Sequence, residues 1–264
     1  MSARNRMVAV YDRAMRGSHH RRYYGNSGYY NFGYWGEGAT AQAEASQALV
    51  DQIAAALPKP GRILDVACGQ GASTARLSQR FPPNDLTGIN LSEAQIASAR
   101  KRAPDCNFDV MSATELDFPD EHFDGVICVE AAFHFDTRDA FLAEAFRVLK
   151  PGGVLTVSDI LFRDLPGWFL EFGQVPRANN LANIDAYRAR WASTGFVDIE
   201  TRDETAACLD GFRNNLAGWP KAERSAGRMK LDRWIASSVA CRMIAGYFGF
   251  VCRRYLLASA RKPG

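Results

Sequence analysis

Between residues 62 and 158 the chain alternates short runs of β-branched and apolar residues with longer stretches of helical spacing. This alternation is typical of βαβ units, which build a parallel sheet covered by helices on both faces. We therefore predict an α/β fold with strands at 62–66, 85–89, 107–111, 123–129 and 154–158. The helices predicted between these strands span 72–80, 93–101 and 138–149.

Two stop signals extend this pattern toward the C-terminus. The turn Lys150-Pro151-Gly152-Gly153 should end the third helix, because a basic residue, a proline and permissive glycines are typical of a helix C-terminus. A second stop at Thr194-Gly195 precedes a predicted sixth strand that reaches Ile199, and residues 254–259 predict a seventh. The connections 161–193 and 203–250 are too long for ordinary loops, so we expect them to contain helices.

These long connections and an N-terminal helical and aromatic segment, 1–45, are expected to cover the carboxyl edge of the sheet as a lid and a helical cap. We interpret residues 1–264 as one domain, because 264 residues at 47% hydrophobic content can bury a single sizeable core. The cap aromatics would line a pocket for a bulky apolar molecule, although helix packing would use the same side chains: Trp168, Phe169, Phe172, Trp219, Trp234, Tyr247, Phe248 and Phe250.

Charge and cysteine content narrow the class of protein. A net charge of +3 gives no field strong enough to dominate binding to nucleic acid, so no nucleic-acid partner is expected. The six cysteines include no CxxC pair and the chain begins without a signal pattern, which favours a cytoplasmic location. The most apolar run, 234–251, is interrupted by Ser237, Ser238 and Arg242, so we expect an amphipathic helix rather than a membrane span. The sequence leaves open whether this helix contacts a membrane surface and which oligomeric state the protein adopts. No metal site is expected.

The most informative stretch is a buried strand that runs into a glycine turn and then a helix, over residues 63–72. Gly69 and Gly71 lack a β-carbon, which lets the backbone approach a ligand closely. A dinucleotide fingerprint would have a third glycine at position 74, where this chain has Thr74, and this argues against NAD or FAD. Asp65 lies just before the turn, where a carboxylate suits a cationic ligand such as the amine of S-adenosylmethionine (SAM). The alternative is that Asp65 only caps the turn.

Four blocks, in order, resemble the class I SAM-dependent methyltransferases, in particular the small-molecule branch that includes ubiquinone, sterol and tocopherol methyltransferases and natural-product O-methyltransferases. The blocks are 65–71, 88–95, 117–124 and 147–153. The resemblance covers most of the chain and implies a Rossmann-like seven-stranded sheet, mostly parallel with an antiparallel last strand. It also implies SAM as the cofactor.

The same resemblance assigns the cofactor contacts. Ala67 and Gly69 would contact the methionine end through their backbone, and Asn90 would hold the ribose hydroxyls where many relatives have an acidic residue. An amide accepts such a hydrogen bond without charge assistance, which weakens it roughly twofold. Leu91 would pack on the adenine, or else belong to the core. The remaining expected cofactor contacts are Gly71, Gln95, Ser112, Ala113 and Glu130.

Residues 29–35 form a dense aromatic patch before the first strand. In related enzymes the corresponding loop folds over SAM, so Tyr30 is a candidate for a polar contact to the methionyl carboxylate. Packing of the N-terminal helix is the alternative role for this patch.

Catalytic residues should follow the fourth and fifth strands, because doubly wound sheets bind ligands at their carboxyl ends. His134 matches a histidine of the O-methylating relatives, and a histidine can take a proton from a hydroxyl near neutral pH. Asp159 would orient His134 or bind the acceptor directly. Each also has a structural alternative, His134 as a packed ring and Asp159 as a helix cap. Phe133 stands where cyclopropane synthases have a glutamate, so methyl transfer ranks above methylene chemistry.

We therefore expect an enzyme that transfers a methyl group from SAM to a small apolar or aromatic acceptor, most plausibly at oxygen, with His134 as the base. N- or C-methylation of a small molecule is the alternative within enzymes. A SAM-binding protein without turnover is the alternative outside them.

Overall fold

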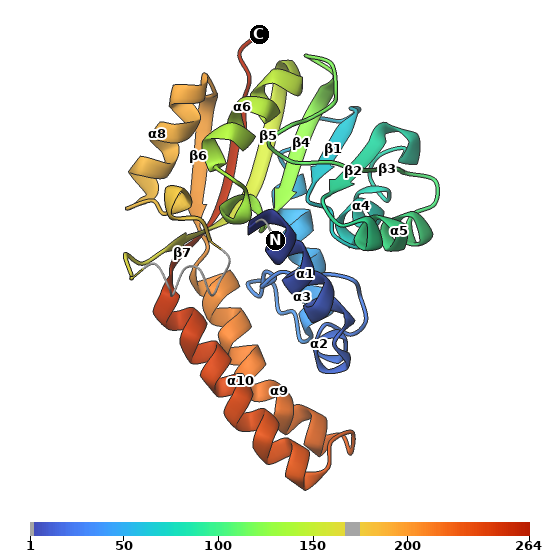
Figure 1. The fold of residues 1–264 in the computed structure, drawn as a ribbon, viewed down its shortest axis with the longest axis vertical. Helices are drawn as coiled ribbons and strands as arrows, with labels where there is room; N and C mark the ends of the chain where they lie inside the picture. The colour runs from blue at the N-terminus through green and yellow to red at the C-terminus, as the bar shows by residue number, and fades with distance from the viewer. Residues whose placement is uncertain (1–2, 167–174) are drawn as a thin grey trace.

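The computed structural model describes residues 3–166 and 175–264, whose strands form a single seven-stranded sheet (Figure 1). The strands follow the order β3-β2-β1-β4-β5-β7-β6, and β7 alone runs antiparallel to its neighbours. This confirms the predicted fold class. Their bounds are β1 (Ile63–Val66), β2 (Leu86–Asn90), β3 (Asn107–Val110), β4 (Phe123–Val129), β5 (Leu149–Phe162), β6 (Val197–Asp203) and β7 (Cys252–Arg261).

Helices cover both faces of the sheet because the central strands are apolar on both sides, as expected for parallel strands. One face packs against α3 (Gln42–Ala54), α4 (Ala72–Leu77) and α5 (Glu93–Arg102). The other packs against α6 (Arg138–Val148) and α8 (Ile184–Thr194). Alternation along β1 shows the two cores directly, since Ile63 faces the first helix layer and Leu64 the second.

The turn predicted at 150–153 lies inside a strand. Helix α6 ends at Val148 as its stop signal implies, but β5 begins at once, because Leu149 already pairs with Phe123 of β4. The register then shifts before Gly125 pairs with Val154, so the four turn residues form an irregularity in the strand. Proline and glycine therefore mark a strand irregularity as well as the end of the helix.

The remaining helices lie away from the two faces. Helices α1 (Ala3–Arg16) and α2 (Ser18–Tyr23) lie at the carboxyl end of the sheet, and α9 (Gly211–Ser225) and α10 (Leu231–Val251) run side by side away from it (Figure 1). Of the predicted cap segments, 203–250 supplies this hairpin, whereas α8 from 161–193 packs against α6 and β6 on the sheet. Residues 167–174, and with them Trp168, Phe169 and Phe172, lie outside the described residues.

Candidate active site

A cavity of about 680 Å³ lies at the carboxyl ends of β1, β2 and β4. Its wall comes from the glycine loop after β1, the residues after β2 and β4, the aromatic loop around Tyr30, helix α1 and the C-terminal end of α10. The lining is mainly apolar with a few polar groups, and the volume lies within the range of small-molecule sites. The cavity therefore lies where doubly wound sheets bind their ligands.

The glycine loop presents its backbone to this cavity. Ala67 and Gly69 both line it and both have positive φ, 61° and 55°, which curves the chain sharply after β1. Gly71 is different, because it does not line the cavity and begins α4 at φ 76°. A β-carbon on Gly71 would lie 2.7 Å from the Cβ of Ala99, so Gly71 allows α4 to pack against α5. The structure thus corrects the cofactor contact expected for Gly71.

Asp65 lies behind the cavity wall. Its carboxylate is buried, and Oδ2 accepts hydrogen bonds from Ser73 Oγ at 2.6 Å and Thr74 Oγ1 at 2.7 Å. Its Oδ1 has no partner in the structure, and burial raises the pKa of the carboxyl to about 6. Ser73 lines the cavity and Asp65 does not. The negative charge of Asp65 would therefore act on a ligand without direct contact. Thr74, which replaces the third glycine of a dinucleotide site, is a donor to this carboxylate.

The residues after β2 form a polar corner of the cavity. Asn90 donates through Nδ2 to Oε1 of Gln95 at 3.1 Å, and Leu91 lines the cavity beside them. Asp12 of α1 closes this corner, since its Oδ1 accepts from Ser92 Oγ at 2.8 Å and from Gln95 Nε2 at 2.7 Å. Ser112 and Ala113 line the cavity from the loop after β3.

Glu130 ties the aromatic loop to the sheet. Its Oε2 accepts from the backbone N–H of Phe32 at 2.8 Å and from the hydroxyl of Tyr255 at 2.5 Å. Burial raises the pKa of Glu130 to about 8, so the carboxyl is largely protonated at neutral pH. Tyr30 lines the cavity and stacks on Tyr24, with ring centroids 5.5 Å apart. Loop and strand therefore meet at a carboxyl group that faces the cavity.

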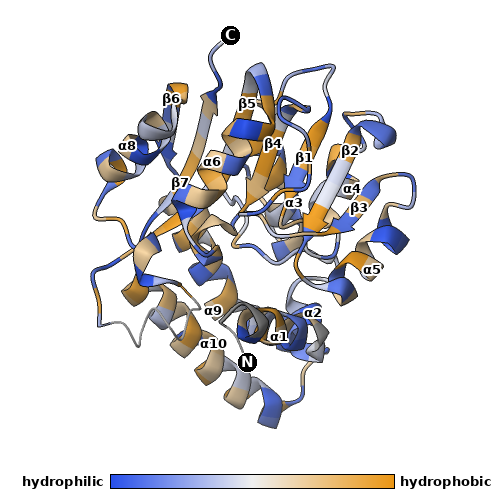
Figure 2. Ribbon diagram, turned by 45° about the horizontal axis from the view of Figure 1, so that its top comes forward, coloured by the Kyte–Doolittle hydropathy of each residue, from blue (hydrophilic) through white to orange (hydrophobic). Residues whose placement is uncertain are grey.

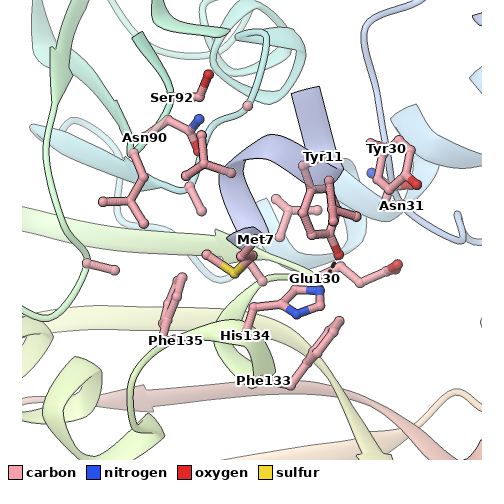
Figure 3. Close-up of a pocket in the computed structure, with 18 of the residues that line it drawn as sticks. Met7, Tyr11, Tyr30, Asn31, Asn90, Ser92, Glu130, Phe133, His134 and Phe135 are labelled. Atoms are coloured by element: carbon pink, nitrogen blue, oxygen red, sulfur yellow. Dashed lines mark hydrogen bonds between the residues drawn. The ribbon is translucent and has the colours of Figure 1, made fainter. Parts of the chain in front are cut away.

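His134 ends a short 3-10 turn, Ala132–His134, directly after β4, and its ring lines the cavity. Figure 3 shows Tyr11 pointing from α1 toward this ring. The Tyr11 hydroxyl and His134 Nε2 form a hydrogen bond. Burial raises the pKa of Tyr11 well above its ordinary value, so the phenol keeps its proton and is able to donate it. Phe133 packs against His134 with ring centroids 4.1 Å apart, so the ring is both packed and hydrogen-bonded.

The structure pairs Asp159 with Arg138, which corrects the expected pairing with His134. Arg138 Nε and Nη2 donate to the two carboxylate oxygens at 2.8 and 3.0 Å, and the backbone N–H of Ile160 donates to Oδ1 at 2.8 Å. Asp159 has no exposed surface and does not line the cavity. A buried carboxylate requires such a partner, and Arg138 at the start of α6 supplies it. The pair fastens α6 to β5.

Sequence reasoning missed the contribution of α1. Met7 and Tyr11 line the cavity from this helix (Figure 3). Met15 also lines it, and Asp12 binds the corner after β2. The spacing of Met7, Tyr11 and Met15 was the available signal, because residues four apart lie on the same helix face. His20 of α2 is half-buried beside this cavity wall. It stacks on both Tyr24 and Tyr30, and burial lowers its pKa to about 4.

These residues fit SAM. Backbone without side-chain obstruction at Gly69 suits the methionine end, the buried charge of Asp65 suits its ammonium group, and Asn90 is placed for ribose hydroxyls. The apolar wall beside Leu91 suits the adenine ring. Asn90 and Ser112 are both neutral, and their amide and hydroxyl accept hydrogen bonds.

Comparison with known proteins agrees with this geometry. Residues 63–153 match the model of a methyltransferase domain. The chain is 31% identical to the erythromycin 3''-O-methyltransferase of Saccharopolyspora erythraea, over 89% of this chain and 84% of the relative. It is 34% identical to the 27-O-demethylrifamycin SV methyltransferase of Amycolatopsis mediterranei, over 88% and 89% of the two chains.

Solved structures show the same fold. The [4+2]-cyclase SpnF superposes with a TM-score of 0.68 at 25% identity, over 92% of this chain and 91% of the cyclase. Phosphoethanolamine N-methyltransferase 2 of Haemonchus contortus, solved with S-adenosyl-L-methionine, gives a TM-score of 0.71 at 21% identity, over 100% of this chain and 60% of that one. The family match, the fold and the cofactor cavity agree, and the chain therefore belongs to the class I SAM-dependent methyltransferases.

Proposed function

We propose that this enzyme methylates a hydroxyl group on a bulky, largely apolar natural product, with His134 as the base. The observation that carries the proposal is the hydrogen bond between His134 Nε2 and the Tyr11 hydroxyl inside the cofactor cavity. That contact brings an O–H group within reach of a basic ring nitrogen, which is the first requirement for deprotonating an acceptor. Tyr11 lies on α1, so an acceptor would take its place when the helix shifts.

SAM supplies an activated methyl group and its own leaving group. The protein therefore has to align the acceptor, exclude water and remove a proton. In the proposed reaction the acceptor oxygen forms a bond to the methyl carbon, the bond from that carbon to sulfur breaks, and the hydroxyl proton passes to Nε2 of His134. Phe133 and Phe135 flank His134 and keep the site apolar, which favours exclusion of water.

The acceptor class follows from the wall of the cavity. Apolar side chains from α1, the turn after β4, the end of β5 and the end of α10 dominate it, including Met7, Phe133, Phe162 and Phe248. Two relatives at 31% and 34% identity are named for the methylation of erythromycin and of a demethylrifamycin. Both names support a large hydroxylated macrocycle as the acceptor.

The test is turnover with SAM on a panel of hydroxylated macrocycles that includes 27-O-demethylrifamycin SV, with the methylated position assigned by mass spectrometry and NMR. We expect an O-methyl product. The variant His134→Gln should lower kcat roughly 10²- to 10⁴-fold, the usual contribution of a general base.

His122→Gln is the matched control, because His122 precedes β4 at the opposite end of the strand from the cavity. Its kcat should equal that of the wild type. An N- or C-methylated product would contradict the proposed reaction. An unchanged kcat in His134→Gln would show that His134 is not the base.

A further inference from the structure

Helix α10 is apolar around most of its circumference yet lies mostly at the surface. It has the length and composition of a membrane-crossing helix, but only 17% of its apolar window is buried. Helices that are apolar on all sides normally lie in a core or in a membrane. The exposed apolar side chains of α10, here called the α10 apolar surface, are Leu231, Ile235, Val239, Met243, Ile244 and Phe250.

The free end of the hairpin is positively charged. Residues 221–233, here called the hairpin tip, contain five basic and two acidic residues. Glu223 is already paired with Arg228 and with Arg22 of α2. Among the described residues, none forms an ion pair with Lys221, Lys230 or Arg233, and all three are exposed. The positive charge of the tip is therefore available to an external partner.

A small cleft at the tip adds hydrogen-bond donors to this charge. Lys221, Arg224, Ser225 and Trp234 line it, and the guanidinium of Arg224 lies 5.7 Å from the centroid of the Trp234 ring. The Trp234 Nε1 donor is buried and finds no acceptor among the residues that the structure describes. Tryptophan beside basic residues is typical of proteins at the boundary between lipid tails and headgroups.

We propose that the α9–α10 hairpin docks on an anionic membrane surface, with α10 lying in the plane of the surface and the basic tip on lipid phosphates. Apolar area and basic residues on one element are the two contributions that bind a helix to anionic lipid. Figure 2 shows the apolar residues along α10 on the part of the hairpin that extends from the sheet.

A membrane span does not fit the connections of this helix. Cys252 leads α10 directly into β7 of the sheet, and α9 packs along α10 with Lys221 and Arg224 exposed on its surface. Crossing the bilayer would carry these charges into the hydrocarbon, which costs several kcal/mol.

A second copy of this chain as the partner is also less favoured. It would have to provide acidic groups for the basic tip. The acidic residues at the base of the hairpin, Asp203 and Asp210, are already paired with Arg254 and Arg213.

The hairpin also connects the docking surface to the active site. Tyr247, Phe248 and Val251, at the C-terminal end of α10, line the cavity. A bilayer held against the exposed part of the same helix would place membrane-dissolved apolar molecules close to the part of the protein that receives the acceptor. This link rests on the proposed acceptor class, whereas the docking itself does not.

The test is sedimentation of the full chain with phosphatidylcholine vesicles, with and without phosphatidylglycerol. We expect binding to vesicles that contain phosphatidylglycerol and a decrease in binding as salt is raised. Lys221→Gln and Lys230→Gln should each weaken this binding roughly fivefold, the effect of about one surface charge. Ile235→Asp with Val239→Asp should reduce it at least roughly tenfold.

Val110→Asp is the matched control, since Val110 is 46% exposed on the edge strand β3 while Ile235 and Val239 are 54% and 55% exposed. It should bind vesicles like the wild type. The proposal is overturned if the wild type binds neither vesicle, or if Val110→Asp is as defective as the α10 variant. It is also overturned if the wild type is a dimer that only the α10 variant dissociates, because α10 would then face a second copy. Turnover on soluble acceptors by the α10 variant separates a docking defect from a failure of the proposed reaction.

Discussion

Two carboxyl groups next to the cavity have pKa values raised by burial, and they are expected to act differently. Asp65, at about 6, is mostly ionised at neutral pH and supplies negative charge behind the glycine loop. Glu130, at about 8, is mostly protonated and accepts hydrogen bonds from Phe32 and Tyr255. Desolvation is the first cause in both cases, and the hydrogen bonds only offset part of it.

Glu130 should make stability depend on pH. Its folded-state pKa of about 8 exceeds the value of 4.5 expected in the unfolded chain, so the folded protein holds an extra proton between these values. The resulting stability is fully present below pH 4.5 and is lost as pH rises to about 8. Glu130→Gln keeps both hydrogen bonds without the proton. We expect the wild type to lose about 2.5 kcal/mol more than this variant between about pH 6 and about pH 8.5, because each pH unit between the two pKa values costs about 1.4 kcal/mol and the loss levels off near the folded-state pKa.

Urea unfolding at the two pH values measures this difference. Parallel loss of stability in both proteins would show that Glu130 does not titrate in this range.

At the scale of elements, α1 combines the features of a lid. It contributes Tyr11 to the histidine and Asp12 to the corner after β2, and its side chains line one side of the cavity. Hydrogen bonds to a carboxylate are among the stronger ones in proteins, about 1.5–3 kcal/mol each. The Asp12 contacts therefore decide how firmly α1 covers the cavity.

Asp12→Ala should loosen this helix. Because Ser92 and Gln95 lose their shared acceptor, we expect dissociation of S-adenosylhomocysteine to become roughly tenfold faster, as measured by stopped-flow fluorescence. Arg13→Ala, an exposed neighbour on the same helix, should leave the rate unchanged. Tighter binding in Asp12→Ala would show that α1 competes with the cofactor instead of covering it.

At the scale of the whole molecule, the cavity joins segments from both ends of the chain. Tyr11, Glu130 and Phe248 lie in one wall although they are more than a hundred residues apart in sequence. A ligand in this cavity contacts α1, three strand ends and α10 at once, so it should stabilise the folded chain as a unit.

SAM at about 100 times its Kd should therefore raise Tm by roughly 5–10 °C, from about 2.7 kcal/mol of binding free energy in a chain of this size. The shift should be smaller at about pH 5 than at about pH 7.5, because Asp65 loses its charge as pH falls through about 6. Asp65→Asn should give a small shift at both pH values. Differential scanning fluorimetry measures all of these shifts. If SAM raised the Tm of Asp65→Asn as much as that of the wild type, the charge of Asp65 would have no part in cofactor binding.

Much of this arrangement was predictable because its signals are local. Strand and helix positions follow from the period of apolar residues, and Ala67, Gly69, Asn90, Leu91 and Ser112 all follow strands whose carboxyl ends meet at one edge. Boundaries were less predictable, as at Leu149, where pairing with Phe123 extends β5 through residues that otherwise favour a turn. Pairing energy between strands outweighs the local preference there.

Sequence alone determined the fold class, the cofactor loop and the histidine at the cavity, because periodicity, glycine positions and strand ends act over a few neighbouring residues. Tertiary structure decided the partners: Arg138 for Asp159, Tyr11 for His134 and Asp12 for Gln95. Each joins residues 21 or more positions apart, and such contacts depend on how whole elements pack. The same reason applies to α10. The sequence led us to expect an amphipathic helix over 234–251, and only the fold shows that most of its apolar surface faces outward.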